Sequence, residues 1–158
     1  MLTLKQINDR ILTPALQLLP DRMDSPRARI QLLAIHLQED PLQERIQRGN
    51  GPARGLFQFE RGGGVRGVLS HESTNDYAVT VCTARGVSPE DKAVWQSLET
   101  DDILAGCFAR LLLWTDPKAM AQNANQGWGL YARVWRPGKP HPEKWDDNYA
   151  RAEHTIMG

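Results

Sequence analysis

Two proline signals delimit one helix more sharply than any other feature of this sequence. Ser25 precedes Pro26, and this pair favours a helix start, because the hydroxyl caps free amide groups and proline suits the first helical position. Pro41 disfavours helical geometry in Asp40, so the helix should end there. One buried face is marked by apolar residues, namely Ile30, Leu33, Ala34 and Leu37. The sequence therefore predicts a helix that has Glu39 at its terminus.

Glycine is dense in the following segment, between residues 48 and 67. Its glycines are Gly49, Gly51, Gly55, Gly62, Gly63, Gly64 and Gly67. Such a density favours loops, a tight hairpin or a backbone that a ligand approaches closely. The triple glycine lacks the lysine and the serine or threonine of a phosphate-binding loop. We therefore expect a small loop or hairpin region around residues 45–65.

The rest of the chain is predicted to be mainly helical. An amphipathic helix is expected from Leu4 to Leu19, whereas the β-branched run Tyr77 to Thr83 predicts a short strand, with a helix end as the alternative. Helix starts are indicated at Ser88-Pro89, Thr100 to Asp102 and Asp116-Pro117, and further helices at Gly127 to Trp135 and Pro142 to Glu153. The string Arg136 to Pro140 predicts a rigid turn. With 158 residues, the chain fits one domain over residues 1–158.

Charge and cysteine content argue against several classes of function. Nineteen Lys and Arg balance nineteen Asp and Glu, so no basic excess favours nucleic acid or an anionic membrane surface as a partner. Cys82 and Cys107 are too few for a disulfide framework and lack the short paired spacings of zinc sites, so buried thiols and no metal are expected. Polar residues interrupt the apolar rhythm of the N-terminus, and no stretch is long enough to span a bilayer. We expect no signal peptide and synthesis in the cytoplasm.

Glu39 is the first candidate for chemistry, because it follows an apolar helix and precedes the glycine-rich segment. Cleavage of a glycosidic bond needs a proton donor, and a carboxyl group on a rigid apolar element can keep its proton near neutral pH. The ordinary alternative is an exposed glutamate at a helix end. Glu60, Glu72 and Asp76 are candidates for the second carboxylate that an inverting hydrolase needs, with a surface position as the default for Glu60 and Glu72.

Two motifs in a fixed order carry a resemblance to a known family. The first is Leu-Gln-Glu-Asp-Pro-Leu at 37–42, and the second is Ala-Arg-Gly-Leu-Phe-Gln at 53–58. The order resembles soluble lytic transglycosylases and goose-type lysozymes, in which a helix ending in Gln-x-Glu-Ser-x-Phe is followed at a similar distance by Ala-Arg-Gly-Leu-Met-Gln. Asp40 in place of the serine and Leu42 in place of the phenylalanine are departures from the family pattern.

The resemblance implies a lysozyme-like domain, mainly α within the α+β class, that cleaves the β-1,4 bond between N-acetylmuramic acid and N-acetylglucosamine. Glu39 would act as acid and then as base, while Gly55, Leu56 and Gln58 would form the sugar-binding floor. Attack by the muramyl 6-hydroxyl would give an anhydro product, as in lytic transglycosylases, and attack by water would require help from another acid. The lack of an obvious second carboxylate favours the first route, and no cofactor is implied. Taken singly, Gly55 is a turn residue and Gln58 a surface amide.

The family's third motif, Ala-Tyr-Asn-Ala-Gly, has only a weak counterpart at 121–125 and lacks the tyrosine. In the family that phenol hydrogen-bonds the catalytic glutamate, so Tyr131 or another donor replaces it here, or catalysis is weaker. Asn123 is the candidate for the matching substrate contact, with helix capping as the alternative. The spacing of Trp128, Tyr131 and Trp135 on one helix face favours core packing, and stacking on a saccharide is the alternative.

The missing signal peptide suggests delivery by something else, and a bacteriophage origin fits. The protein would be an endolysin released through a holin or a lysin carried in the virion, with peptidoglycan glycan strands as partner and, in the virion, other phage particle proteins. A second class is a non-catalytic phage structural protein that retains a lysozyme-like scaffold. A third is a small helical adaptor with no link to sugars. Glu39 facing a groove lined by Gly55 and Gln58 is the geometry that would favour the enzyme.

Overall fold

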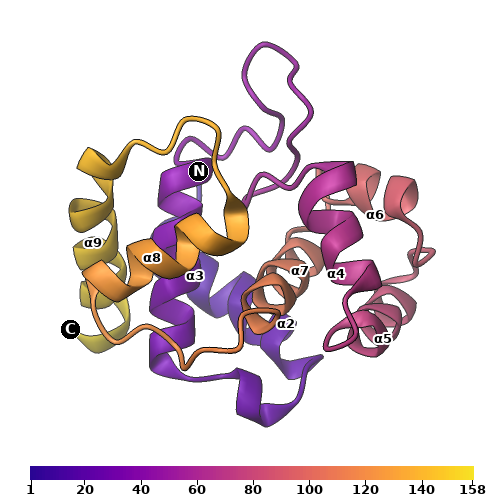
Figure 1. Ribbon diagram of the computed structural model, residues 1–158, viewed down its shortest axis with the longest axis horizontal. Helices are drawn as coiled ribbons and strands as arrows, with labels where there is room; N and C mark the ends of the chain where they lie inside the picture. The colour runs from indigo at the N-terminus through magenta and orange to yellow at the C-terminus, as the bar shows by residue number, and fades with distance from the viewer.

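The computed structural model describes residues 1–158 and is mainly helical (Figure 1). The elements in chain order are α1 (Leu4–Ile7), the π-helical turn η1 (Asn8–Leu12), α2 (Thr13–Gln17), the 3-10 turn η2 (Asp21–Met23), α3 (Pro26–Glu39), the π-helical turn η3 (Arg61–Val65), α4 (Arg66–Ser70), α5 (Asn75–Arg85), α6 (Asp91–Ser97), α7 (Asp102–Trp114), α8 (Ala124–Trp135), the 3-10 turn η4 (Pro142–Lys144) and α9 (Trp145–Met157). The predicted mainly helical class is confirmed. Pairing of extended backbone is limited to isolated antiparallel bridges of Arg54 with Ile46 and with Phe59.

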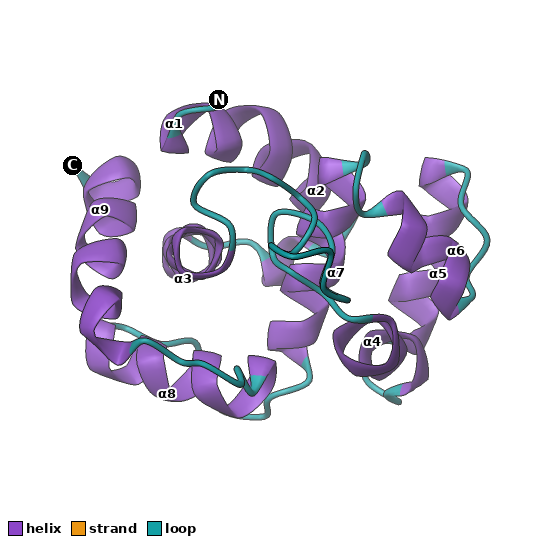
Figure 2. Cartoon of the chain, turned by 90° about the horizontal axis from the view of Figure 1, so that it is seen from above, coloured by secondary structure: helices purple, strands orange, loops and turns teal.

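The helix α3 has the bounds that the proline signals predict. The Ser25 hydroxyl accepts a hydrogen bond from the Ala28 amide at 3.1 Å, and Asp40 leaves helical geometry with φ −143° and ψ 57°. Almost every residue from Ala28 to Leu37 is buried, since α3 is surrounded by other helices. Seen end-on in Figure 2, it lies between α9 and α7. Glu39 therefore stands at the end of a rigid central element.

One hydrophobic cluster of 36 buried residues joins the helices from both ends of the chain. The predicted N-terminal helix is present as α1, η1 and α2, which continue into one another and bury Ile7, Leu12 and Leu16. α7 is buried along nearly its whole length, and its Cys107, like Cys82 in α5, is a buried free thiol as expected. A single continuous core thus supports the surface on which Glu39 lies.

Three local predictions are wrong. The run Tyr77 to Thr83 is not a strand but forms the middle and latter part of α5, as the helical alternative had it, because Ala78, Val81 and Cys82 share one buried face at helical spacing. No helix begins at Asp116-Pro117: the Asp116 carboxylate instead pairs with Arg133 at 3.1 Å, and the next helix begins at Ala124. The triple glycine, for which a loop or hairpin was expected, lies in the turn η3, whose backbone leaves helical geometry at Gly63 with φ −98° and ψ −105°.

The loop region predicted around residues 45–65 is present from Asp40 to Glu60, where the chain forms turns and the two bridges before η3 begins. The predicted helices at Gly127 to Trp135 and Pro142 to Glu153 are also present within α8 and within η4 and α9. None of the helices has the length and apolar character that crossing a membrane requires.

Candidate active site

A cavity of about 480 Å³ opens at the C-terminal end of α3. Its walls come from the end of α3, the loop between residues 47 and 60, the end of α8 and the loop after α8. Residues far apart in the sequence, such as Glu39, Gln58 and Tyr131, therefore face one space. We call this space the central cavity.

Glu39 lines the central cavity with a carboxyl group that favours its protonated form. Burial raises the pKa of Glu39, a hydrogen bond from Tyr131 lowers it, and the neighbouring Asp40 carboxylate raises it, so that the net pKa is about 7 in place of an ordinary 4.5. A carboxyl group with this pKa is largely protonated at slightly acid pH and can still release its proton near neutrality. This is the property that a general acid needs.

Tyr131 supplies the hydrogen bond to Glu39. Its hydroxyl donates to Glu39 Oε1 at 2.7 Å, and its ring stacks on Trp145 with a 10° angle between planes and 5.4 Å between centroids. The side chain is only 2% exposed, so packing fixes the phenol in place. Tyr131 thus makes the hydrogen bond to Glu39 that was expected from a substitute for the tyrosine of the third motif. Its position is eight residues beyond Asn123, outside that motif.

The second motif lies against the end of α3 because two ring nitrogens hold its backbone. His36 Nδ1 lies 3.0 Å from the Leu56 carbonyl oxygen, and Trp135 Nε1 donates to the Phe57 carbonyl oxygen at 2.9 Å. Burial lowers the pKa of His36, so the ring is neutral and donates its Nδ1 proton to Leu56. These bonds join α3, the motif and α8 into one wall.

Three residues of the second motif, Gly55, Leu56 and Gln58, were predicted to contact sugar. Of these three, only Gln58 lines the central cavity. It is half-buried, adopts a left-handed backbone with φ 53°, and lines the central cavity beside Glu39. Its Nε2 donates to the Gly55 carbonyl oxygen at 3.0 Å, and no protein group binds its Oε1. The amide is held in place and keeps acceptor capacity for a ligand.

The predicted roles of Gly55 and Leu56 need correction. Gly55 is buried with φ 85°, and a Cβ added there would lie 2.9 Å from the Leu98 carbonyl oxygen. Glycine is therefore required by a left-handed turn packed on protein backbone, not by a sugar ring lying against it. The Leu56 side chain is fully buried in the core. Neither residue lines the central cavity, so both support the floor from beneath.

Asn123 is also placed away from the groove. Its side chain caps α8 by accepting a hydrogen bond from the Gln126 amide at 2.9 Å, and it does not line the central cavity. Asn123 is therefore a helix cap, which was the alternative to a substrate contact. The weak third motif leads into the helix that carries Tyr131 and contributes nothing to the cavity wall itself.

Asp40, at the position where the lytic transglycosylase pattern has a serine, organises the loop that follows. Its carboxylate accepts hydrogen bonds from the amides of Glu44 at 2.9 Å and Arg45 at 3.1 Å. Arg45 in turn makes a two-point ion pair with Asp102, with 2.7 and 2.8 Å between nitrogen and oxygen atoms, and accepts a bond from the Gly55 amide on its carbonyl. The departure from the family pattern therefore has a structural role that joins the first motif to the second.

Glu60 is the only one of the three other candidate acids that lines the central cavity. It is exposed and lies at the rim, whereas Glu72 and Asp76 belong to the segment around α5. Among the predicted aromatic residues, Trp135 lines the cavity and Trp128 packs against Tyr131 and Trp145.

Two further spaces share lining residues with the central cavity. A space of about 610 Å³, the distal cavity, shares Glu60, Trp135 and Arg136 with it and is walled by the glycines of η3 and α4. A smaller space of about 90 Å³ shares Glu39 and Gln58 and leads toward Leu42 and Ile46. An extended polymer thus has a path past Glu39.

No family model, curated protein or solved structure matches this chain. Interpretation of the groove therefore depends on its own chemistry.

No group of three or more His, Cys, Asp or Glu residues is arranged to hold a metal ion. Another cavity of about 560 Å³ lies beside α2 and α3, where Asp24 and Arg29 pair with each other at 2.9 Å and Asp21 is the exposed acid without an ion pair.

Sequence reasoning missed the residues that fix the wall formed by the loop after α8. Gln38 donates from Nε2 to the carbonyl oxygens of Pro140 and His141, both at 2.9 Å, and accepts from Asn148 at 3.0 Å. The distinctive string 136–140 was the available signal, since two prolines in five residues indicate a stiff loop. Its partner could not be recognised, because Gln38 is more than a hundred positions away.

Proposed function

We propose that this chain is a lysozyme-like enzyme that cleaves the β-1,4 bond between N-acetylmuramic acid and N-acetylglucosamine in peptidoglycan. The observation that carries the proposal is the Glu39 carboxyl, which lines the central cavity with its pKa raised to about 7. Two neighbouring spaces that share lining residues with the central cavity support a polymeric substrate, because such a chain could occupy more than one of them.

In the proposed reaction Glu39 donates its proton to the glycosidic oxygen as the bond to the anomeric carbon breaks. The carboxylate that results accepts the Tyr131 hydrogen bond, which favours the charged form. Glu39 then removes a proton from the attacking hydroxyl. With the muramyl 6-hydroxyl as nucleophile, the product is a 1,6-anhydro sugar, and no second carboxylate is required.

Gln58 is the proposed contact for an acetamido group. Its Nε2 is held by the Gly55 carbonyl, while its Oε1 can accept a hydrogen bond from the amide of an N-acetyl sugar. Trp135 and Tyr131 bound the same space, although the Tyr131 ring packs on Trp145 and offers the groove mainly its hydroxyl end. Delivery to the cell wall after release, or as part of a phage particle, belongs to the same proposal.

The test is release of muropeptides from purified peptidoglycan, measured by mass spectrometry. The parent protein should release 1,6-anhydro muropeptides, and Glu39→Gln should release none, because it keeps the shape of the side chain but removes the acid. Glu72→Gln, which is outside the groove, is the matched control and should behave as the parent. Absence of products from a folded parent protein would contradict the enzyme and favour the non-catalytic phage structural component.

A further inference from the structure

The loop after α8 is a rigid part of the groove that the proposed reaction does not yet use. Arg136 and His141 both have left-handed backbones, with φ of 49° and 50°, and two prolines lie between them. Gln38 binds the carbonyl oxygens of Pro140 and His141 and is the residue next to Glu39 on α3. The position of the loop is therefore fixed relative to the candidate acid.

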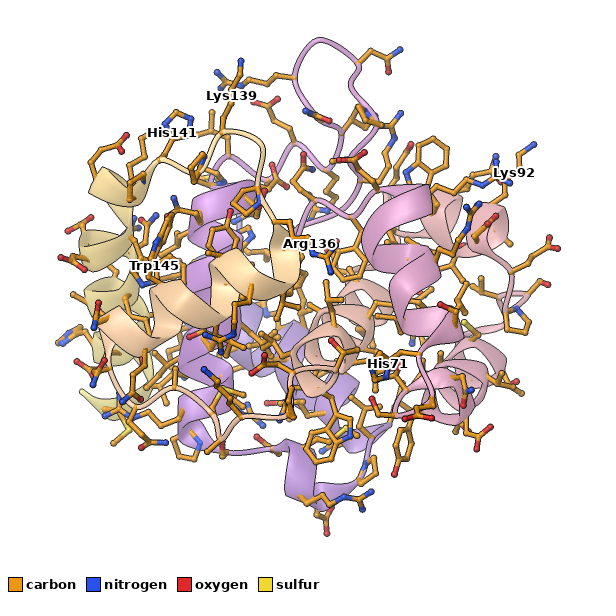
Figure 3. All side chains as sticks on the ribbon, in the orientation of Figure 1. His71, Lys92, Arg136, Lys139, His141 and Trp145 are labelled. Carbon is orange, nitrogen blue, oxygen red and sulfur yellow. The ribbon has the colours of Figure 1, made fainter.

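This loop carries two cations that no carboxylate neutralises. Arg136 and Lys139 are exposed, and neither forms an ion pair, whereas the nearby Arg133 is paired with Asp116 at 3.1 Å. Figure 3 shows Arg136 at the end of α8, on the side facing α4, and Lys139 farther along the loop at its outer edge. Both line the central cavity, and Arg136 also lines the distal cavity.

The positive charge of this edge is local, since the whole chain has a formal net charge of zero. The charged groups that face the same spaces are Glu39, which is largely protonated below its pKa of about 7, the exposed Glu60, and the paired Arg133 and Asp116. Glu60 lines the central and the distal cavities, as Arg136 does, and makes no ion pair with Arg136. An anionic group entering these cavities would thus meet Arg136 with its donors free.

We propose that Arg136 and Lys139 form a carboxylate-binding edge, which selects glycan strands that carry carboxylates over neutral strands of N-acetylglucosamine. This inference rests on the proposed function, because it names the feature of peptidoglycan that the same groove recognises. Muramyl residues carry a lactyl branch, whose own carboxylate is free in a naked strand and is replaced by the carboxylates of the stem peptide in a substituted one. An arginine guanidinium binds a carboxylate through two parallel hydrogen bonds, and a lysine adds a point charge.

The test measures binding in the Glu39→Gln background, so that no ligand is cleaved. Calorimetry would compare three tetrasaccharides: one of N-acetylglucosamine alone, one alternating with muramic acid bearing free lactyl groups, and one alternating with muramic acid bearing stem peptides. We expect at least one carboxylated ligand to bind roughly 3- to 10-fold more tightly than the neutral one. The preference should shrink in 0.5 M salt, because exposed charges separated by more than about 4 Å are largely screened at this ionic strength.

Arg136→Gln combined with Lys139→Gln should abolish this preference and leave the affinity for the neutral tetrasaccharide unchanged, which also shows that the variant is folded. Lys92→Gln on α6, which removes a positive charge away from the groove, should retain the preference (Figure 3). The carboxylated ligand whose affinity falls in the double variant shows whether the edge binds the lactyl carboxylate or a carboxylate of the stem peptide. Equal binding of neutral and carboxylated ligands by the Glu39→Gln protein, or a preference that survives the double substitution, would overturn this inference alone. Failure of every saccharide to bind would overturn the proposed function with it.

Discussion

The Tyr131 hydroxyl donates a 2.7 Å hydrogen bond to Glu39 Oε1. This bond links α8 to α3 through two residues that are 92 positions apart in the sequence. The bond acts against burial: loss of solvent disfavours the carboxylate, whereas the phenol donor favours it. The pKa of about 7 is the balance of these effects. Burial raises the pKa of Tyr131, and the contact with Glu39 raises it as well, because ionisation of the phenol would place a second negative charge beside the carboxylate.

Removing the phenol oxygen should make Glu39 a weaker acid. In Tyr131→Phe the donor is lost, so the pKa of Glu39 should rise and the alkaline limb of the pH–activity profile should move upward by about one pH unit. Activity at the optimum should fall about tenfold, because the carboxylate formed by proton transfer loses its hydrogen bond. Tyr149→Phe is the matched control, since Tyr149 packs on Trp145 in the same cluster without contacting Glu39. A shift of the limb to lower pH would contradict this account of the bond.

The acid should also reduce the stability of the protein at alkaline pH. Because the pKa of Glu39 is raised from 4.5 to about 7 on folding, the stability linked to its proton is fully present below pH 4.5 and is lost as the pH rises through 7. The free energy of unfolding of Glu39→Gln should therefore be roughly 2–3 kcal/mol higher than that of the parent at pH 8, so the variant is the more stable protein there. At pH 4 the two free energies of unfolding should differ little. Urea denaturation at both pH values measures this. An equal difference in unfolding free energy at pH 4 and at pH 8 would show that burial does not raise the pKa of Glu39.

Gly55 should be needed for folding rather than for contact with sugar. In Gly55→Ala the new methyl group would meet the Leu98 carbonyl oxygen at 2.9 Å in a left-handed backbone, and we expect a loss of about 1–3 kcal/mol in unfolding free energy. Gly62→Ala is the control, because no atom lies within 4 Å of the added carbon. Denaturation without ligand compares the two. Full stability of Gly55→Ala together with lost activity would instead restore the role of a bare backbone under a sugar.

Glu60 distinguishes the two routes of the proposed reaction. Its exposed position on the rim leads us to expect that Glu60→Gln releases 1,6-anhydro products at a rate close to that of the parent, since Glu39 alone serves as acid and base. An inverting hydrolase places a second carboxylate across the bond to activate water. Reducing-end products that disappear in Glu60→Gln would identify such a hydrolase, and Glu72→Gln provides the control outside the groove.

The sequence by itself determined the elements whose signals are local. Ser25, Pro26 and Pro41 specified the bounds of α3, because capping and the steric effect of proline act within a few residues. This placed Glu39 at a helix end, and the resemblance to lytic transglycosylases, not the local sequence, implied that Gln58 would be nearby. Sequence patterns failed where the local signal was ambiguous. The β-branched residues of α5 suggested a strand, but a helical face of Ala78 and Cys82 could be buried in the core.

Only the tertiary structure decided which candidate residues meet. Tyr131 faces Glu39 because α8 packs on α9, where the Tyr131 ring stacks on Trp145, and α9 packs on α3. Gly55 and Leu56 turned inward for an equally non-local reason, the approach of Leu98 and the bond from His36. The raised pKa of Glu39 has the same origin, because desolvation depends on everything packed around a group and cannot be assigned from its neighbours in the chain.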